Sequence, residues 1–187
     1  MAASNMGVKT LFLFATEAEA APFRTLRPDA TVVIIGVGMA EAAAGTAAAI
    51  VEHKPERVVL CGIAGACDER LSVGQVVEVL HDRVEGLPDA YVEEYECDRL
   101  TGLDFARTLT VSRSGDAMRN EEIVAGEVPV VEQMEGAAVA AVVIALGVED
   151  YCHIRAISNR VGEPFAQWRV GEAVAALAAV VAQLFTE

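Results

Sequence analysis

Short apolar runs that alternate with alanine-rich segments are the feature that most limits the possible folds of this chain. Residues 8–15, 31–35 and 57–61 are nearly continuous in apolar side chains, as expected of strands buried on both faces of a sheet. The alanine-rich segments 17–26 and 40–53 have helical composition, with small side chains that can pack close to a sheet. Strands that alternate with helices predict a mainly parallel sheet with helices on both faces.

The second half of the chain continues this alternation. Residues 73–81 alternate apolar and polar side chains, which is typical of a half-exposed strand. Further strands are expected at 109–112, 128–131 and 152–158, and further helices at 135–146 and 166–185. No internal repeat or linker separates these segments, so we expect one domain over residues 1–187. The predicted fold class is α/β, with three αβα layers and a mixed central sheet.

Residues 85–104 depart from this pattern. The segment contains Pro88, two glycines and seven acidic residues. We expect a loop or excursion here, in which Glu93, Glu94 and Glu96 belong to a solvated face.

The charge of the chain limits its partners. There are 28 acidic against 14 basic residues, which gives a formal net charge of −14. A surface this negative repels phosphate backbones and anionic lipids, so we expect no nucleic-acid or membrane partner and favour a small-molecule substrate. The cysteines form no CxxC pair and have no histidine at zinc-ligand spacing, so neither a metal nor another cofactor is expected. The first residues lack the basic and apolar regions of a signal peptide, which favours a cytoplasmic enzyme.

Glycines, carboxylates and an amide gather where the predicted strands end. In parallel sheets, ligands bind at the carboxyl ends of strands, where glycines let them approach the backbone and polar side chains supply chemistry. The segments concerned are 15–19, 36–38, 62–65, 133–135 and 158–160. We therefore expect a site at this edge of the sheet, with residues 62–65 in a turn that follows the strand 57–61.

Taken together and in this order, the five segments resemble a known family. Residues 133–138, Gln-Met-Glu-Gly-Ala-Ala, are similar to the Met-Glu signature at a helix start in the nucleoside phosphorylase and nucleosidase superfamily. Residues 154–159, Ile-Arg-Ala-Ile-Ser-Asn, resemble its late strand, which ends in a base-contacting Asp or Asn, and residues 15–19 resemble the acidic motif of its hydrolytic branch. The resemblance implies a phosphorylase/hydrolase-like fold, cleavage of an N-glycosidic bond, and a homo-oligomer (a dimer or larger) in which a neighbour closes the pocket.

Within that superfamily, residues 157–162 followed by Trp168 are most similar to futalosine hydrolases, which release hypoxanthine from futalosine in menaquinone biosynthesis. The related methylthioadenosine and S-adenosylhomocysteine nucleosidases have Asp where this chain has Asn159. A carboxyl group can protonate N7 of adenine and accept from its 6-amino group, whereas an amide NH2 can donate to N7 or O6 of a 6-oxopurine. Asn159 thus favours a hypoxanthine-like base.

The resemblance also implies roles for individual side chains. Glu19 would orient and deprotonate the attacking water, Glu135 would hold the ribose hydroxyls, and Asn159 would stabilise the departing purine. The other expected substrate contacts are Met134 against the sugar, Ile63, Ala64 and Gly65 on the water side, Val37 and Met118 beside the base or the 5′ substituent, and Gln133 and Gly38. Residues 15–19 contain two glutamates and no arginine, which favours water over a phosphate dianion as the nucleophile.

Other readings stay open for single residues and for the whole chain. Glu17 and Glu19 begin a predicted helix, where acidic residues are favoured by the helix dipole, and Asn159 could bond its own backbone at a strand end. The first alternative function is an adenine-releasing nucleosidase that acts on methylthioadenosine, S-adenosylhomocysteine or aminodeoxyfutalosine. The second is a non-catalytic nucleoside-binding relative, because the chain is shorter than is typical of the family.

Overall fold

The computed structural model describes residues 8–186, apart from the side chains of 122 and 123. Its strands are β1 (Thr10–Phe14), β2 (Thr31–Ile34), β3 (Arg57–Ala66), β4 (Val76–Val84), β5 (Tyr95–Glu96), β6 (Phe105–Thr110), β7 (Val130–Gln133) and β8 (Asp150–Arg160). Its α-helices are α1 (Glu17–Leu26), α2 (Met39–His53), α3 (Glu121–Val124), α4 (Gly136–Leu146) and α5 (Val170–Leu184), and its 3-10 turns are η1 (Asp89–Tyr91), η2 (Asp116–Arg119) and η3 (Phe165–Gln167). Within residues 8–186, every helix is too short or too polar to cross a membrane.

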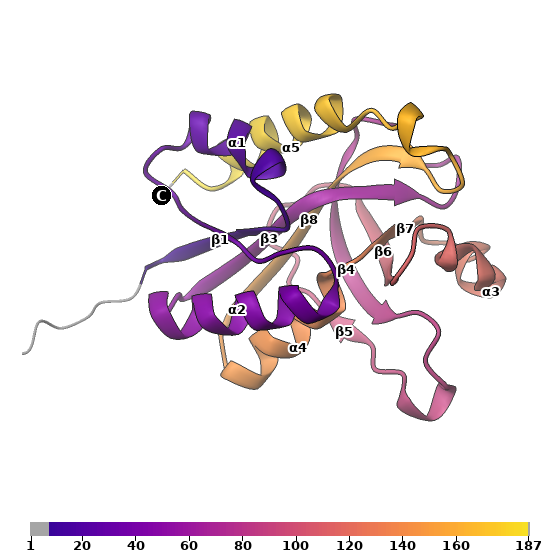
Figure 1. Cartoon of the computed structure of the whole chain (residues 1–187), viewed down its shortest axis with the longest axis horizontal. Helices are drawn as coiled ribbons and strands as arrows, with labels where there is room; N and C mark the ends of the chain where they lie inside the picture. Colours follow the sequence, from indigo (N-terminus) through magenta and orange to yellow (C-terminus); the bar gives the residue numbers. More distant parts are fainter. Residues whose placement is uncertain (1–7, 187) are drawn as a thin grey trace, which may run out of the picture.

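Helices cover both faces of the sheet, which confirms the predicted three-layer α/β fold. In Figure 1, α1 and α5 lie above the sheet, while α2 and α4 lie below it. Successive side chains of a strand point to opposite faces, so Phe14 of β1 packs in the same core as Leu177 of α5, whereas Leu13 packs in the same core as Val139 of α4. The continuous apolar run in the sequence is therefore explained by burial on both faces.

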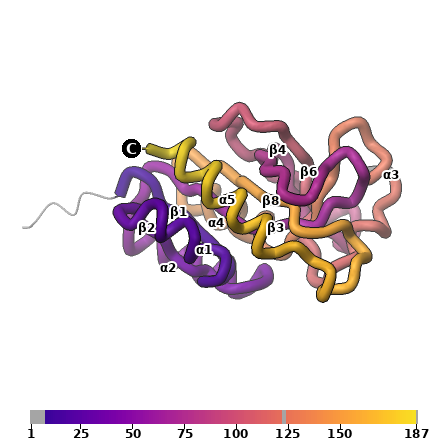
Figure 2. The backbone as a smooth tube through the Cα atoms, turned by 90° about the horizontal axis from the view of Figure 1, so that it is seen from above, coloured from indigo at the N-terminus to yellow at the C-terminus, as the bar shows by residue number. Residues whose placement is uncertain are grey.

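The sheet is mixed, as predicted, and part of it closes on itself. Strands β2, β1, β3 and β8 are parallel neighbours in that order. Strand β4 then pairs antiparallel with β8 and parallel with β6, while β7 pairs parallel with β6 and antiparallel with β3. The pairing thus follows a closed circuit, β3-β8-β4-β6-β7 and back to β3. Figure 2 shows β4 and β6 at the opposite end of the molecule from β2 and α2.

Strand β3 is longer than the sequence predicts. It continues through residues 62–65, so the expectation of a turn there is wrong. The glycines of this segment leave room for side chains instead of making a turn: a Cβ on Gly62 would lie 2.4 Å from Nη1 of Arg155. Strand β8 also extends beyond the predicted 152–158 at both ends. The two central strands therefore carry their side chains directly to the expected site.

Strand β4 is more buried than its alternating pattern predicts: four of its nine residues are buried, and the other five are partly exposed. It lies between β6 and β8 in the closed circuit, and Val77, Glu78 and Val79 are all inaccessible to solvent. One oxygen of the Glu78 carboxylate accepts hydrogen bonds from the N–H groups of Leu100 and Thr101, at 2.8 and 3.0 Å. The polar residue of the pattern thus anchors a loop and does not face water.

The acidic segment 85–104 is mainly irregular, as predicted, and its three adjacent glutamates, 93, 94 and 96, are exposed. Its only described regular pieces are η1 and the two-residue strand β5, which pairs with β4. The following strands are displaced from their predicted positions, because β6 covers 105–110 and β7 covers 130–133. Pro129 has no N–H to donate to a ladder, so β7 begins after it and not at 128.

Candidate active site

A cavity of about 320 Å³ lies at the carboxyl ends of β1, β3 and β8, next to the first residues of α1 and α4. This volume is at the lower end of the range of small-molecule sites, roughly 300–1,000 Å³. The predicted site residues that line it are Glu19, Val37, Ile63, Ala64, Gly65, Gln133, Met134, Glu135 and Asn159. The other two predicted residues are not among the described lining residues. Gly38 donates its N–H to the carboxylate of Glu135, and Met118 lies on η2, where it is 43% exposed.

Glu19 is held by the first turn of α1 and also by β3. Its Oε2 accepts hydrogen bonds from the N–H and Oγ1 of Thr16, at 3.1 and 2.8 Å, and its own N–H donates to Thr16 Oγ1. This is a complete capping box, so the capping role considered for Glu19 is present. Its other oxygen, Oε1, accepts from the N–H of Ile63 at 3.1 Å. The carboxylate therefore caps a helix and lines the cavity with one fixed orientation.

Glu135, the second carboxylate of the cavity wall, is the N-cap residue of α4. Its Oε1 accepts a hydrogen bond from the N–H of Gly38 at 3.1 Å, and its Oε2 lies 3.4 Å from Nη2 of Arg155. Gly38 has φ +84°, in the left-handed region that favours glycine, so the turn after β2 presents its N–H to the carboxylate. Glu135 is 4% exposed, and an arginine balances its charge.

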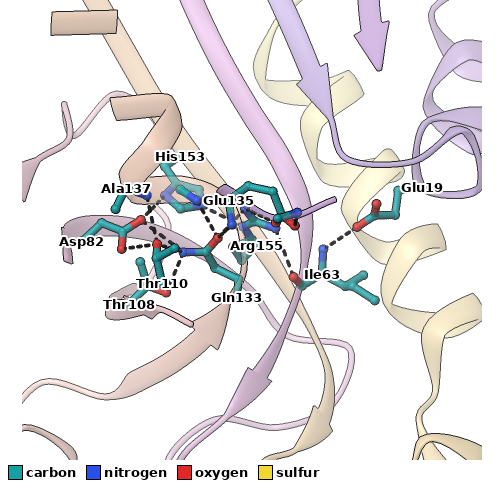
Figure 3. Close-up of polar contacts among 12 residues, drawn as sticks. Glu19, Ile63, Asp82, Thr108, Thr110, Gln133, Glu135, Ala137, His153 and Arg155 are labelled. Atoms are coloured by element: carbon teal, nitrogen blue, oxygen red, sulfur yellow. Dashed lines mark hydrogen bonds and ion pairs between the residues drawn. The ribbon is translucent and has the colours of Figure 1, made fainter. Parts of the chain in front are cut away.

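Arg155 is a site residue that the sequence predictions missed. Arg155 is 1% exposed, and its Nη1 and Nη2 donate to the carbonyl of Ile63 at 3.2 Å and to Oε1 of Gln133 at 3.0 Å. Figure 3 shows it between Glu135 and the Ile63 peptide, whose N–H in turn points to Glu19. A charged residue inside the predicted strand 152–158 was the available signal, because burying an arginine requires partners for its donors.

Asn159 is brought to the cavity by an irregularity in the pairing of β8. The β3–β8 register shifts between Ala64 and Gly65, so that both Ser158 and Asn159 line the cavity. The amide Nδ2 donates to the carbonyl of Arg160 at 2.9 Å, and Oδ1 accepts from Ser158 Oγ at 2.8 Å. A carbonyl can only accept, so these bonds fix which end of the amide is NH2. Among residues 8–186, the carbonyl of Arg160 is the one acceptor of this NH2 group, so its second N–H is available to a ligand.

Two further parts of the wall come from loops. Glu132 accepts hydrogen bonds from Ser114 Oγ and from the N–H groups of Gly115 and Ala117, and it thereby fixes the loop before η2 on the cavity. On the other side, Phe165 and Trp168 line the cavity with ring centroids 5.1 Å apart. Trp168 is the residue of the sequence motif that follows 157–162.

The described residues contain no cluster of three or more His, Cys, Asp or Glu side chains arranged to hold a metal ion. The charged and amide side chains of the described lining are instead three carboxylates, one guanidinium and two amides: Glu19, Glu132, Glu135, Arg155, Gln133 and Asn159. This set can hold a neutral polar molecule and place a negative charge on either side of it.

Comparison with known proteins agrees with this fold. A family model described as the phosphorylase superfamily matches residues 17–83. No curated protein sequence matches the chain. Among solved structures, the native futalosine hydrolase of Helicobacter pylori strain 26695 has a TM-score of 0.83 at 17% identity, over 97% of this chain and 98% of that one.

Two nucleosidases have somewhat lower TM-scores. The Helicobacter pylori 5′-methylthioadenosine/S-adenosylhomocysteine nucleosidase has a TM-score of 0.79 at 16% identity, over 96% of this chain and 98% of that one. The Arabidopsis thaliana 5′-methylthioadenosine nucleosidase has a TM-score of 0.78 at 20% identity, over 96% and 95%. By its fold and by the match of residues 17–83, the chain resembles the nucleoside phosphorylase and nucleosidase superfamily, as its motifs predict.

Proposed function

We propose that the protein is an N-glycosidase that hydrolyses the bond between a purine and a ribose. The observation that carries the proposal is that Glu19, Glu135 and Asn159 line one cavity although they are far apart in the chain. Each is nearly buried and held by bonds to the protein, so each has a defined orientation toward a ligand. The likeness to solved nucleosidases supports the same activity.

The proposed chemistry follows from the charges. As the C1′–N9 bond breaks, positive charge develops on the ribose, and the two carboxylates stabilise it from either side. Glu135 binds the ribose hydroxyls, and Glu19 takes a proton from the water whose oxygen bonds to C1′. The purine leaves with the electron pair of the broken bond. The N–H of Asn159 stabilises that charge at N7 or O6, and the purine is reprotonated from solvent.

Hydrolysis is favoured over phosphorolysis by the cations of the cavity. Among the described lining residues, Arg155 is the sole cationic side chain. Its guanidinium already donates to His153, Ile63 and Gln133. A phosphate dianion would require cationic donors that are not already engaged, whereas a neutral water requires only an acceptor such as Glu19.

The proposed substrate is futalosine, which would yield hypoxanthine and dehypoxanthine futalosine. The fixed NH2 of Asn159 suits the acceptors of a 6-oxopurine, and this chemistry supports the choice of base. The test is to incubate the purified protein separately with futalosine and methylthioadenosine and to quantify the released bases. Faster release of hypoxanthine supports the proposal. Predominant adenine release would favour an adenine-releasing nucleosidase, and binding without turnover would favour a non-catalytic relative.

Replacement of Asn159 by Asp tests whether the hydrogen bonds of this side chain determine which purine base is recognised. A carboxyl group can protonate N7 and accept from a 6-amino group, so Asn159→Asp is expected to shift the ratio of kcat/KM values toward 6-aminopurine nucleosides by at least about tenfold. The measurement is that ratio for futalosine and aminodeoxyfutalosine. Asn159→Ala is the control, because it removes the amide without adding a carboxyl. An unchanged ratio in the Asp variant would contradict the assigned role of the amide.

We also propose that the protein is a homodimer. Helix α4 consists of Gly, Ala, Val, Ile and Leu only, and a helix that is apolar all round is normally buried. Ile144 and Leu146 of α4 and Val51 of α2 are nevertheless exposed in the single chain. A second copy would cover these side chains. Light scattering at micromolar protein is expected to give twice the mass of the chain, and the mass of one chain would contradict the proposal.

A further inference from the structure

A buried row of polar side chains extends from the cavity into the closed part of the sheet. Arg155 Nε donates to His153 Nε2 at 2.7 Å, and His153 Nδ1 lies 3.8 Å from Oδ2 of Asp82. Arg155 in turn contacts Glu135 and the peptide of Ile63. Figure 3 shows this row leading from Asp82, at one end, to Glu19 at the other. None of the functional roles proposed above uses Asp82 or His153.

The hydrogen bond from Arg155 determines the tautomer of His153. An arginine can only donate, so Nε2 must be the unprotonated nitrogen and the neutral imidazole carries its proton on Nδ1. Burial, and then the charge of Arg155, lower the pKa of His153 well below its ordinary value, which keeps the ring neutral. Within the described structure, Nδ1 has no hydrogen-bond partner, and the carboxyl of Asp82 faces it.

Asp82 is itself fixed from a second direction. Its Oδ1 accepts from Thr110 Oγ1 at 2.8 Å, and its Oδ2 accepts from Gln133 Nε2 at 3.2 Å. The other end of the Gln133 amide accepts from Arg155, so hydrogen bonds connect Asp82 to the guanidinium through Gln133, while His153 lies between Arg155 and Asp82 without a hydrogen bond to Asp82. Every member of this set is nearly or fully buried.

The first residue of α4 is compatible with this arrangement only because it is glycine. A Cβ on Gly136 would lie 2.1 Å from Oδ2 of Asp82 and 2.5 Å from Cε1 of His153. Glu135, the residue before it, holds the cavity end of the row. Two successive residues at the start of α4 therefore contact the row, Gly136 at Asp82 and His153 and Glu135 at Arg155.

We propose that His153 and Asp82 are positioning residues, which hold Arg155 by its Nε so that the guanidinium fixes Glu135 and, through the Ile63 peptide, Glu19. The inference rests on the proposed function, because it assigns the two residues to the placement of the carboxylates that act on the sugar. His153 and Asp82 are absent from the described lining of the cavity and reach a substrate only through Arg155. Their effect is expected on the placement of groups at the transition state and less on binding of the base.

A matched pair of variants separates positioning from packing. The side-chain amide of His153→Gln can place an acceptor oxygen near the position of Nε2, whereas His153→Leu fills similar space without an acceptor. For futalosine hydrolysis, His153→Leu is expected to lower kcat at least about tenfold, the effect of losing one hydrogen bond to a charged group, with KM changed less than about threefold. His153→Gln is expected to restore kcat to within about threefold of the wild type. Equal kcat values in the two variants, whether normal or reduced, would overturn the proposal.

A second measurement does not depend on turnover. The imidazole ¹⁵N shifts of His153 in the full chain are expected to show a protonated Nδ1 and a hydrogen-bonded, unprotonated Nε2 at neutral pH, and Asp82→Ala is expected to alter the Nδ1 signal. A protonated Nε2 would overturn the proposal even if the enzyme is active. A wild-type protein that releases no purine but has the expected shifts would refute the proposed function alone, since the bond that holds Arg155 would still be present.

Discussion

The two ends of the sheet differ in what they bury. Around β1 and β2, with helices on both faces, the interior is formed by side chains such as Leu13, Phe14 and Phe23. In the closed circuit of β3, β4, β6, β7 and β8, the buried side chains include a set of polar and charged residues: Glu78, Asp82, Thr108, Thr110, Glu132, Gln133, His153 and Arg155. One end resembles an ordinary apolar core, and the other contains a connected polar network.

This difference indicates that one end of the sheet mainly contributes stability and that the other mainly fixes the positions of site residues. Apolar packing contributes free energy of folding that is roughly proportional to the area it removes from water. Buried polar groups contribute little net stability, but they are directional and fix the positions of their neighbours. The candidate site lies between the two ends, with Glu19 from the apolar end and Arg155 and Glu135 from the polar one. We therefore expect substitutions at the two ends to separate stability from catalysis.

The largest effect is expected for Glu19→Gln, which tests whether a residue of the apolar end belongs to the site. Glutamine keeps the capping box, because its side-chain oxygen can still accept from the Thr16 N–H. The variant loses the general base, so kcat is expected to fall about 10³-fold while the affinity for nucleoside changes little. Steady-state kinetics, together with calorimetric binding of a slow substrate, measure both quantities. A normal kcat would mean that Glu19 serves only as a cap.

The next largest effect is a loss of stability, and it is expected for a substitution in the apolar end of the sheet. Leu13 is fully buried in the core shared with α2 and α4. Leu13→Ala is expected to lower the free energy of unfolding by about 3 kcal/mol through lost burial and an unfilled cavity. The kcat per folded molecule is expected to remain within twofold of the wild type, roughly the spread expected for a change outside the site. Urea unfolding and active-site titration measure the two quantities separately.

The matched change at the polar end is Thr110→Val, which preserves shape and removes the hydroxyl. Thr110 Oγ1 bonds Asp82 and accepts from Gln133 Nε2 and from the N–H of Ala137. Leaving these buried donors unpaired is expected to cost about 1–3 kcal/mol of stability. Unlike Leu13→Ala, this variant is also expected to lower kcat. If both variants change stability and kcat in the same proportion, the division between the two ends is wrong.

The same contrast explains which features could be predicted from the sequence. Apolar periodicity gave the layers, the helices and the mixed sheet, and the short motifs gave residues that converge on one cavity, because these patterns are local. The closed circuit was not predictable. The alternation in β4 indicates a strand with one face exposed to solvent, and it does not reveal that Glu78 accepts hydrogen bonds from residues 100 and 101. Arg155 and His153 were missed for the same reason: a polar residue in a buried strand shows its partners only after folding.

The smallest effect is a pH dependence of stability, and it tests whether Asp82 is buried as a neutral acid. Burial, the largest cause, raises the pKa of Asp82 to about 8, against the opposing effects of Thr110 and Arg155. Between about pH 4 and 8 the folded protein then holds a proton that the unfolded chain has lost, so this group makes stability fall as pH rises. His153 has the opposite effect below its ordinary value of about 6.5, where only the unfolded chain binds the proton.

The interval from pH 6.5 to 8 therefore isolates Asp82. Across it, the free energy of unfolding of the wild type is expected to fall by about 1–2 kcal/mol, which corresponds to one proton. Asp82→Asn has no such proton and is expected to show a flat profile in urea unfolding over the same interval. The buried thiols lie outside this interval, since their pKa values are raised from an ordinary value already above 8. Parallel profiles for the two proteins would mean that Asp82 is ionised in the folded state, and the polar end would then contain a buried charge that Arg155 must balance.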